Sequence, residues 1–478
     1  MLDEAQRDQR ERSARGIAAL SAWAAGLRWD DIPHAARHAM ARILADDMAS
    51  MLAARDEPEL AAAHAALLRD SRAPEATLMR AGGPKVDLRL AMTGNGLAAA
   101  WTETDSGYSK APSHPGLCSL PALLAVAECD GLSARELLRA ATVAYEVVAR
   151  LAGCWGSVVP PVHPHGLFNA PGAATAIAMA RGFDAYRLQL ALTAAVTMIS
   201  PGPYSHADDG ALVRNAWPAA GAQSGLLACE LAGSGMGGIA EGPWDVYAGL
   251  LHAKTREQAL TDALGTRWAV TEGYHKRHGC CQVAHAALDA MESLLQAHPG
   301  LRGGEGVASI KVDLPADGMH MAERHPANGL AARFSVPHAI AAMLVNGDAG
   351  VAGFGPAALA DDRITRLREQ VALADWGALK PWPLHRPGRV TITLRDGTVL
   401  SDERESARGG ADQPLGDDEL LAKCEGLAGD AAPGLRTTVQ ALMHAIAKDE
   451  AALDVPWRDW MRRLFLAPAS PARSDQTG

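Results

Sequence analysis

Apolar residues recur at helical spacing through the first 300 residues of the chain. The run "SARELLRAATVAYEVVARLAG" (133–153) begins with Ser133, a residue type that caps helix N-termini, and Glu136 three positions later completes a capping box. The pattern continues in "PGAATAIAMARG", "RLQLALTAAVTMI" and "SGLLACELAGSG". Because these later runs are apolar on most faces, they predict helices that are buried against one another.

The pattern changes after about residue 300. "GVASIKVDLP" (306–315) alternates as a strand does, and "RVTITLRDGTVLSDE" (389–403) predicts two strands joined by the hairpin signal Asp396-Gly397. A helix is expected between them in "SVPHAIAAMLVNG". "ELLAKCEGLAG" and "TTVQALMHAIAK" then return to helical spacing, and "APASPARSDQTG" has the composition of a disordered tail. The chain therefore predicts a helical body with a smaller α/β unit.

Composition and charge exclude several classes of protein. The chain has 478 residues, 48% of them hydrophobic, and a net charge of -10 with no basic stripe, so we expect no nucleic-acid partner. The first residues, "MLDEAQRDQRERSARG", lack the apolar region of a secretory signal, and no stretch is apolar for long enough to span a bilayer. We expect a cytoplasmic protein without a membrane partner, in which the seven dispersed cysteines are free thiols.

Two motifs have simpler explanations than cofactor binding. Gly233, Gly235 and Gly238 have GxGxxG spacing, but a helical run precedes them instead of a strand, which indicates a helix end and a turn. Neighbouring Cys280 and Cys281 would chelate one ion poorly, and no second ligand pair follows at a familiar spacing. We therefore expect no nucleotide and no metal.

The stretch "GYHKRHGCCQVAHAALDA" (273–290) gathers polar residues within an otherwise apolar region. On a helix, Cys281, His285 and Asp289 would share one face, with Lys276 just ahead of it. Small apolar residues surround this face, so a solvated surface fits poorly and the lining of a site fits better.

Two loops rich in glycine and proline carry further polar residues. One loop places Glu103, Asp105 and His114 between two apolar helical patterns, and loops held by a rigid scaffold are where function concentrates. The other loop sets His163 and His165 just before a buried helix, whose N-terminus would suit a carboxylate. An ordinary polar connection and a structural histidine remain the alternatives at these two places.

In this order the three clusters resemble the MmgE/PrpD family, which includes 2-methylcitrate dehydratase, cis-aconitate decarboxylase and iminodisuccinate epimerase. The likeness runs from about residue 15 to about residue 465. Its markers are "HPGLCSLPALLAVAE", "HPHGLFNAPGAATAIAMARGFD", "AAGAQSGLLACELAGSGMGG", "HKRHGCCQVAHAALDA" and "ARFSVPHAIAAMLVNG".

The resemblance implies a mainly α fold in which a large all-helical domain is joined to a smaller α/β lid domain. We expect the N-terminal part of the helical domain at 1–268, the lid domain at 269–405, C-terminal helices that rejoin the helical domain at 406–465 and a disordered tail at 466–478. The resemblance also implies a homodimer that works without a metal or organic cofactor.

The resemblance assigns site residues as well. It implies catalytic roles for Glu103, Asp105, His114, His163 and Lys276. Substrate-binding roles are expected for Arg214, Cys281, His285, His338 and Arg277. The chain departs from the family pattern in several places: Ala100 replaces a histidine, Arg214 a lysine and His338 a tyrosine, and "ETDSGYS" (103–109) replaces a run of aspartates and threonine. Arg214 can hold a carboxylate bidentately but cannot donate a proton near neutral pH, so we expect an unusual substrate.

The reactions of this family share a carbanion or enolate next to a carboxylate, which requires a proton carrier and cations. We expect a hydro-lyase similar to 2-methylcitrate dehydratase, acting on a small polycarboxylate. His114 and His163 are the acid/base candidates, Asp105 or Glu103 orients one of them, and Lys276 with Arg214 binds carboxylates. The alternatives are a decarboxylase, an epimerase, a non-catalytic scaffold, or a nucleophilic Cys281 thiolate stabilised by Lys276 or a histidine.

Overall fold

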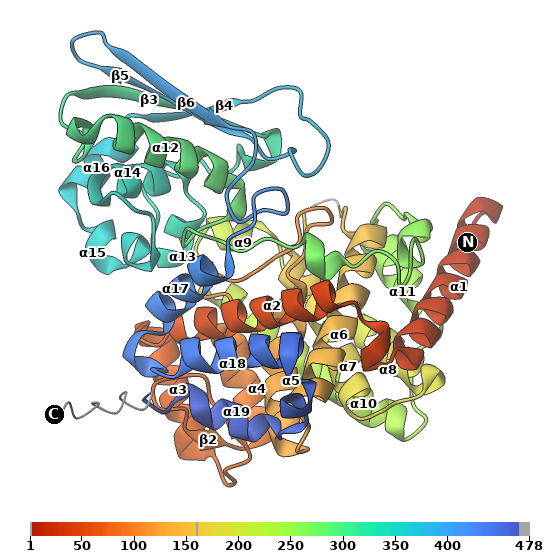
Figure 1. Ribbon diagram of the computed structural model, residues 1–478. Helices are drawn as coiled ribbons and strands as arrows, with labels where there is room; N and C mark the ends of the chain where they lie inside the picture. Colours follow the sequence, from red (N-terminus) through yellow and green to blue (C-terminus); the bar gives the residue numbers. More distant parts are fainter. Residues whose placement is uncertain (1, 159–160, 468–478) are drawn as a thin grey trace, which may run out of the picture.

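The computed structural model describes residues 2–158 and 161–467. Figure 1 shows a larger helical unit and a smaller unit in which helices lie against a sheet. Each unit has its own hydrophobic core. The predicted fold class, a helical domain with a smaller α/β domain, is confirmed.

The helical unit is built from helices that pack closely through small residues. Gly172 lies so near Cys118, and Gly225 so near Ala173, that a side chain at either glycine would collide with the neighbouring helix. The helices are α1 (Glu4–Gly26), α2 (His34–Ala53), α3 (Pro58–Asp70), α4 (Leu88–Ala98), α5 (Pro115–Cys129), α6 (Ala134–Trp155), α7 (Pro164–Ala180), α8 (Ala185–Thr197), α9 (Ser205–Asp208), α10 (Trp217–Gly233) and α11 (Gly242–Trp244). A short antiparallel pair, β1 (Ala76–Thr77) and β2 (Lys85–Val86), joins them.

The smaller unit, which we call the lid, contains a mixed sheet with the strand order β4-β3-β5-β6. β3 pairs with β4 in parallel and with β5 antiparallel, and β5 and β6 form the predicted hairpin. Helices α12, α14 and α16 lie on one side of this sheet (Figure 1). The elements are α12 (His285–Ala297), β3 (Val307–Leu314), α13 (Gly329–Arg333), α14 (Val336–Asn346), α15 (Pro356–Leu359), α16 (Asp362–Arg368), β4 (Val371–Asp375), β5 (Gly388–Leu394) and β6 (Val399–Arg404).

The C-terminal helices return to the helical unit. Figure 1 shows them, in blue, beside the red helix α2, and their apolar residues belong to the core of the helical unit. They are α17 (Asp417–Ala428), α18 (Leu435–Lys448) and α19 (Trp457–Leu464). Two segments far apart in the sequence therefore complete one core, on which the loops of the site rest.

The local predictions are confirmed in several places. The capping box of Ser133 and Glu136 begins α6, and the GxGxxG glycines form the end of α10 and a turn, in which Gly235 has a φ of 78°. The exact division at residues 268 and 405 stays a prediction. The predicted disordered tail lies outside the described residues from position 468 onward. Within the described ranges, every helix is too short or too polar to cross a bilayer.

Candidate active site

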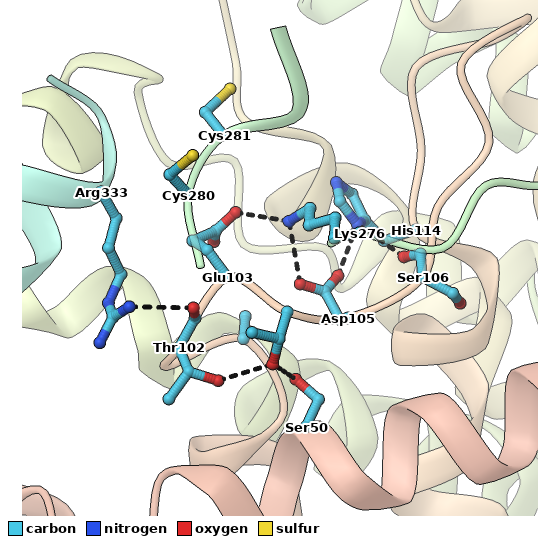
Figure 2. Close-up of polar contacts among 12 residues, drawn as sticks. Ser50, Thr102, Glu103, Asp105, Ser106, His114, Lys276, Cys280, Cys281 and Arg333 are labelled. Atoms are coloured by element: carbon cyan, nitrogen blue, oxygen red, sulfur yellow. Dashed lines mark hydrogen bonds and ion pairs between the residues drawn. The ribbon is translucent and has the colours of Figure 1, made fainter. Parts of the chain in front are cut away.

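The loop that follows α4 is buried, although it consists of polar residues. All residues of 102–106 are at most 3% exposed. The Thr104 hydroxyl bonds the Ser50 hydroxyl of α2 at 2.8 Å, and the Asp47 carboxyl group of α2 accepts the backbone N–H of Ser106 at 2.8 Å (Figure 2 shows the Ser50 contact). Because α2 satisfies these groups, the loop can remain in the interior with a fixed shape.

Glu103 adopts a φ of 53°, in the left-handed region that residues with a side chain rarely occupy. In this conformation its carboxylate accepts hydrogen bonds from Arg214 Nη2 at 2.5 Å and from Lys276 Nζ at 2.7 Å. Lys276 Nζ also donates to Asp105 Oδ1 at 3.1 Å, so it lies between the two carboxylates (Figure 2). These contacts compensate for the unfavourable backbone angle at Glu103.

The four charges of this network are all deeply buried. Burial alone would raise the pKa of Glu103, but the charges of Arg214 and Lys276 outweigh it and hold that pKa well below its ordinary value. Burial would likewise lower the pKa of Lys276, but Asp105 and Glu103 raise it above its ordinary value. The network therefore contains two cations and two carboxylates at neutral pH.

His114, the residue that precedes α5, forms a dyad with Asp105. Its Nδ1 lies 2.6 Å from Asp105 Oδ2 and 3.0 Å from the carbonyl oxygen of Ser106. Both neighbours are acceptors, so Nδ1 carries a proton and Nε2 is left for a substrate. A histidine oriented by a buried carboxylate in this way is the arrangement of a general base.

His163 is the N-cap of α7, and its Nδ1 accepts the backbone N–H of His165 at 3.2 Å. Burial, followed by the charge of Arg214, holds the pKa of His163 well below its ordinary value, so the ring is neutral. The Arg214 guanidinium can only donate, and its Nη2 lies 3.2 Å from His163 Nε2, so both ring nitrogens of His163 face N–H donors. Arg214 therefore orients the His163 ring, and both side chains line the same cavity.

His165 was noted in the sequence only as a neighbour of His163, yet it occupies a central position. It is 1% exposed, and neither of its ring nitrogens has a hydrogen-bond partner among the described residues. Its ring lies edge-on to the rings of His114 and His163, at centroid distances of 4.8 Å and 4.4 Å. His165 therefore packs between His114 and His163.

A cavity of about 570 Å³ opens beside these residues, between the helical unit and the lid. We call one part of the cavity the deep end. It consists of Glu103, Asp105, His114, His163, Arg214 and Lys276. Asp105 does not line the cavity itself and lies behind His114 and Lys276. Its walls include the apolar side chains Pro112, Pro161, Pro203, Val283 and Phe334. We call the part nearer solvent the mouth, which is formed by Asp208, Asp317, His320 and Arg386.

The lid is fixed to the buried loop 102–106 by an arginine. Arg333 of α13 donates from Nη1 to the carbonyl oxygens of Thr102 and Gly279, each at 3.0 Å (Figure 2 shows the bond to Thr102). The same contact joins the loop of the helical unit with the segment that carries Lys276. The cavity therefore has one well-defined shape in this structure.

The structure brings six of the predicted residues to the cavity surface. They are Glu103, His114, His163, Arg214, Lys276 and Cys281. Cys281 Sγ lies 3.8 Å from the Tyr204 hydroxyl, and burial raises the pKa of its thiol. A thiol with a raised pKa is mostly protonated at neutral pH, so the nucleophile alternative has no support from this environment.

Three predicted substrate-binding residues do not line the cavity. The predicted helical face fails because α12 begins only at His285, whereas Cys281 precedes a short 3-10 turn, Gln282–Ala284. His285 Nε2 instead bonds the Cys280 carbonyl at 3.2 Å.

The other two residues lie within the lid. His338 Nε2 bonds the Gly353 carbonyl oxygen at 2.8 Å, and the ring packs against Phe354. Arg277 Nη1 donates to Asp289 at 2.8 Å and to Glu292 at 2.9 Å. Both side chains are already bonded by neighbours, so neither reaches the cavity.

Sequence reasoning missed an aromatic wall and the whole mouth. Tyr204 stacks on His163 at a centroid distance of 5.0 Å, and Tyr274 is edge-on to His114 at 6.3 Å. The run "SPGPYSHADDG" around Tyr204 is another glycine- and proline-rich loop with polar residues, the signal that identified the other two loops.

One group of side chains has the composition of a metal site but not the available atoms. Ligand atoms of Asp105, His114 and His165 lie within 4.8 Å of one another. However, one Asp105 oxygen accepts from Lys276 and the other faces His114 Nδ1, so a metal would have to displace both bonds beside an ammonium group. The site is therefore suited to proton transfer and anion binding rather than to a metal.

Comparison with known proteins gives consistent matches along the chain. The family model of the MmgE/PrpD N-terminal domain matches residues 18–257, and that of the MmgE/PrpD C-terminal domain matches residues 278–448. The "Cis-aconitate decarboxylase-like protein oryM" of Aspergillus oryzae is 26% identical over 471 residues, covering 92% of this chain and 95% of the relative. The "Cis-aconitate decarboxylase" of Aspergillus terreus is 26% identical over 452 residues, covering 86% and 89%.

Proposed function

The chain belongs to the MmgE/PrpD family, and from this premise we propose that it is a lyase that breaks a bond next to a carboxylate through an enolate intermediate. The observation that carries the proposal is the deep end of the cavity. A proton carrier, His114, lies in the same cavity as two buried cations, Arg214 and Lys276, that supply N–H donors. Enolate chemistry needs this combination of a proton carrier and fixed donors.

In the proposed reaction, the carboxylate that the substrate retains lies against Arg214, His163 and Lys276. The bond to a second carboxylate breaks with release of CO₂, and the electron pair of that bond delocalises onto the retained carboxylate as an enolate. The donors hold the developing charge in a buried site, where their effect is strongest. His114, protonated from solvent, then delivers a proton to carbon, and Asp105 stabilises the imidazolium form of His114.

Two observations favour decarboxylation over the dehydration that was expected from the sequence. The relatives from Aspergillus have names that contain cis-aconitate decarboxylase. Dehydration also needs a second acid for the departing hydroxyl, whereas His163 is held neutral and Lys276 is bound to two carboxylates. Decarboxylation needs one proton carrier only, which His114 supplies.

Proton NMR in D₂O of the chelator-treated full-length protein tests the proposal. The panel contains unsaturated di- and tricarboxylates, among them cis-aconitate, together with 2-methylcitrate as a dehydration substrate. We expect one unsaturated carboxylate to lose CO₂ and to gain deuterium at carbon, and the His114→Gln variant to be at least about 100-fold slower. An alkene formed from 2-methylcitrate would assign dehydration instead, and no turnover or exchange with any compound would refute the proposed function.

A further inference from the structure

The deep end has no excess positive charge to offer a substrate. Its cations, Arg214 and Lys276, are matched by the carboxylates of Glu103 and Asp105, which contact them at distances from 2.5 to 3.1 Å. A substrate carboxylate bound here is held by directed donors and not by a surplus of charge. The binding of further carboxylates then depends on what the mouth provides.

The mouth carries acceptors that lack partners. Asp208 Oδ2 bonds His320 Nδ1 at 2.9 Å, but Asp208 Oδ1 is buried and has no hydrogen-bond partner among the described residues. The Asp317 carboxylate makes no ion pair within the described part of the chain. Arg386, the cation on this side, donates from Nη1 to Gln282 at 2.5 Å, and its Nε has no hydrogen-bond partner among the described residues. With two carboxylates against one arginine and one histidine, the mouth also lacks a positive surplus.

A single aromatic residue links the two ends. Tyr204 stacks on His163 at 5.0 Å and meets His320 edge-on at 5.2 Å, so the mouth is two ring-to-ring steps away from the catalytic histidine. The volume of about 570 Å³ is in the range of pockets that hold ligands larger than a six-carbon acid. A substrate held at the deep end can therefore reach the mouth along an apolar wall.

We propose that Asp208 and Asp317 form a second subsite that binds a hydrogen-bond-donating group of the substrate, cationic or neutral, so that the enzyme prefers a carboxylate bearing such a group over a tricarboxylate. The inference rests on the proposed function, because it takes a substrate carboxylate to lie at the deep end. A donor group suits the carboxylates of Asp208 and Asp317, which line the cavity, whereas a third carboxylate would face them as a like charge.

Binding of three matched ligands, measured by isothermal titration calorimetry on the full-length protein, tests this subsite. Tricarballylate has a carboxylate at the central carbon, 3-(aminomethyl)glutarate has an ammonium group there, and 3-methylglutarate has neither. We expect the aminomethyl compound to bind at least about tenfold tighter than tricarballylate, with the methyl compound between them.

Variants separate the subsite from general electrostatic effects. Asp317→Asn and Asp208→Asn should each reduce the preference for the aminomethyl compound several-fold. Asp209→Asn, an exposed neighbour that does not line the cavity, should leave it unchanged. Asp317 makes no side-chain ion pair that folding would lose, and thermal denaturation confirms that each variant is folded.

The possible outcomes distinguish the two proposals. Tricarballylate binding as tightly as the aminomethyl compound, or a preference that survives in both aspartate variants, would overturn the subsite and leave the proposed function intact. Failure of all three ligands to bind at millimolar concentration would overturn both, since the deep end would then not hold a carboxylate.

Discussion

At the deep end of the cavity the carboxylates are matched by cations, whereas at the mouth the acceptors outnumber their partners. Glu103, Lys276 and Arg214 are at most 3% exposed, but the side chains of Asp208 and His320 are 22% and 39% exposed. A buried charge without a partner would destabilise the fold by several kcal/mol, whereas a charge near solvent costs little. The deep end is therefore fixed by stability as well as by its proposed chemistry, whereas substitutions at the mouth should cost little stability.

The largest expected difference between the two ends is the loss of stability when a cation is removed from one or from the other. Lys276→Met leaves Asp105 and Glu103 without a shared partner in the interior, so the free energy of unfolding should fall by about 3–5 kcal/mol. Arg386→Met, which loses one hydrogen bond to Gln282 at the mouth, should cost less than about 1 kcal/mol. Urea denaturation of both variants measures the difference, and equal losses would contradict the contrast between the two ends.

The same contrast should appear in kinetics between two histidines. His114→Gln removes the proton carrier, so kcat should fall at least about 100-fold, which corresponds to about 2.7 kcal/mol of transition-state stabilisation. His320→Gln changes a ground-state contact at the mouth, so its effect should fall mainly on KM and amount to a few-fold. A large loss of kcat in His320→Gln would mean that the mouth takes part in the chemistry.

A smaller effect is expected from Arg214→Lys, which keeps the charge but loses the planar fork. Arg214 donates at once to Ala100 O at 3.1 Å, Asn215 Oδ1 at 3.2 Å and Glu103, and a lysine cannot make all of these contacts. We expect kcat/KM to fall roughly tenfold. Arg277→Lys is the control, because Arg277 was predicted to bind substrate and the structure places it outside the cavity. A comparable loss in Arg277→Lys would favour the prediction from sequence.

Much of the fold could be predicted because its signals are local. The capping box of Ser133 and Glu136 and the hairpin turn at Asp396-Gly397 each depend on residues a few positions apart, and both are present. Periodicity cannot tell where a helix begins, and for this reason Cys281 was placed on the helix that starts at His285. The helix starts four positions later than Cys281, so Cys281 lines the cavity whereas His285 bonds the backbone.

The two ends of the cavity also differ in how well the sequence predicts them. The deep-end residues stand in motifs that the resemblance covers, with Glu103, Asp105 and His114 within one loop. The mouth residues come from separate segments, and exposed Asp and Arg residues are common on any surface. Only the fold brings Asp208 of α9 within 2.9 Å of His320 of the lid, so no local pattern could identify the mouth.

The smallest expected effect is the response of each end to pH. The hydrogen bond to Asp208 raises the pKa of His320 above its ordinary value, so the stability that this pair contributes is fully present below pH 6.5 or so and is lost as the pH rises through the raised pKa. At the deep end the pKa values of Glu103 and Asp105 are lowered, so pH acts in the opposite direction. The stability that these two carboxylates contribute is lost as the pH falls below about 4.

Thermal denaturation of the wild type and of His320→Gln between about pH 5.5 and 9 isolates the contribution of the mouth. Because the His320 side chain is 39% exposed and screened by solvent, the pair should contribute only a few tenths of a kcal/mol, about 1 °C or less in Tm. The wild type should be the more stable of the two at the acidic end of this range, and the difference should vanish at the alkaline end. A stability difference between the wild type and His320→Gln that grows with rising pH would mean that His320 is held in its neutral form. The negative charge of Asp208 would then lack a cationic partner in His320.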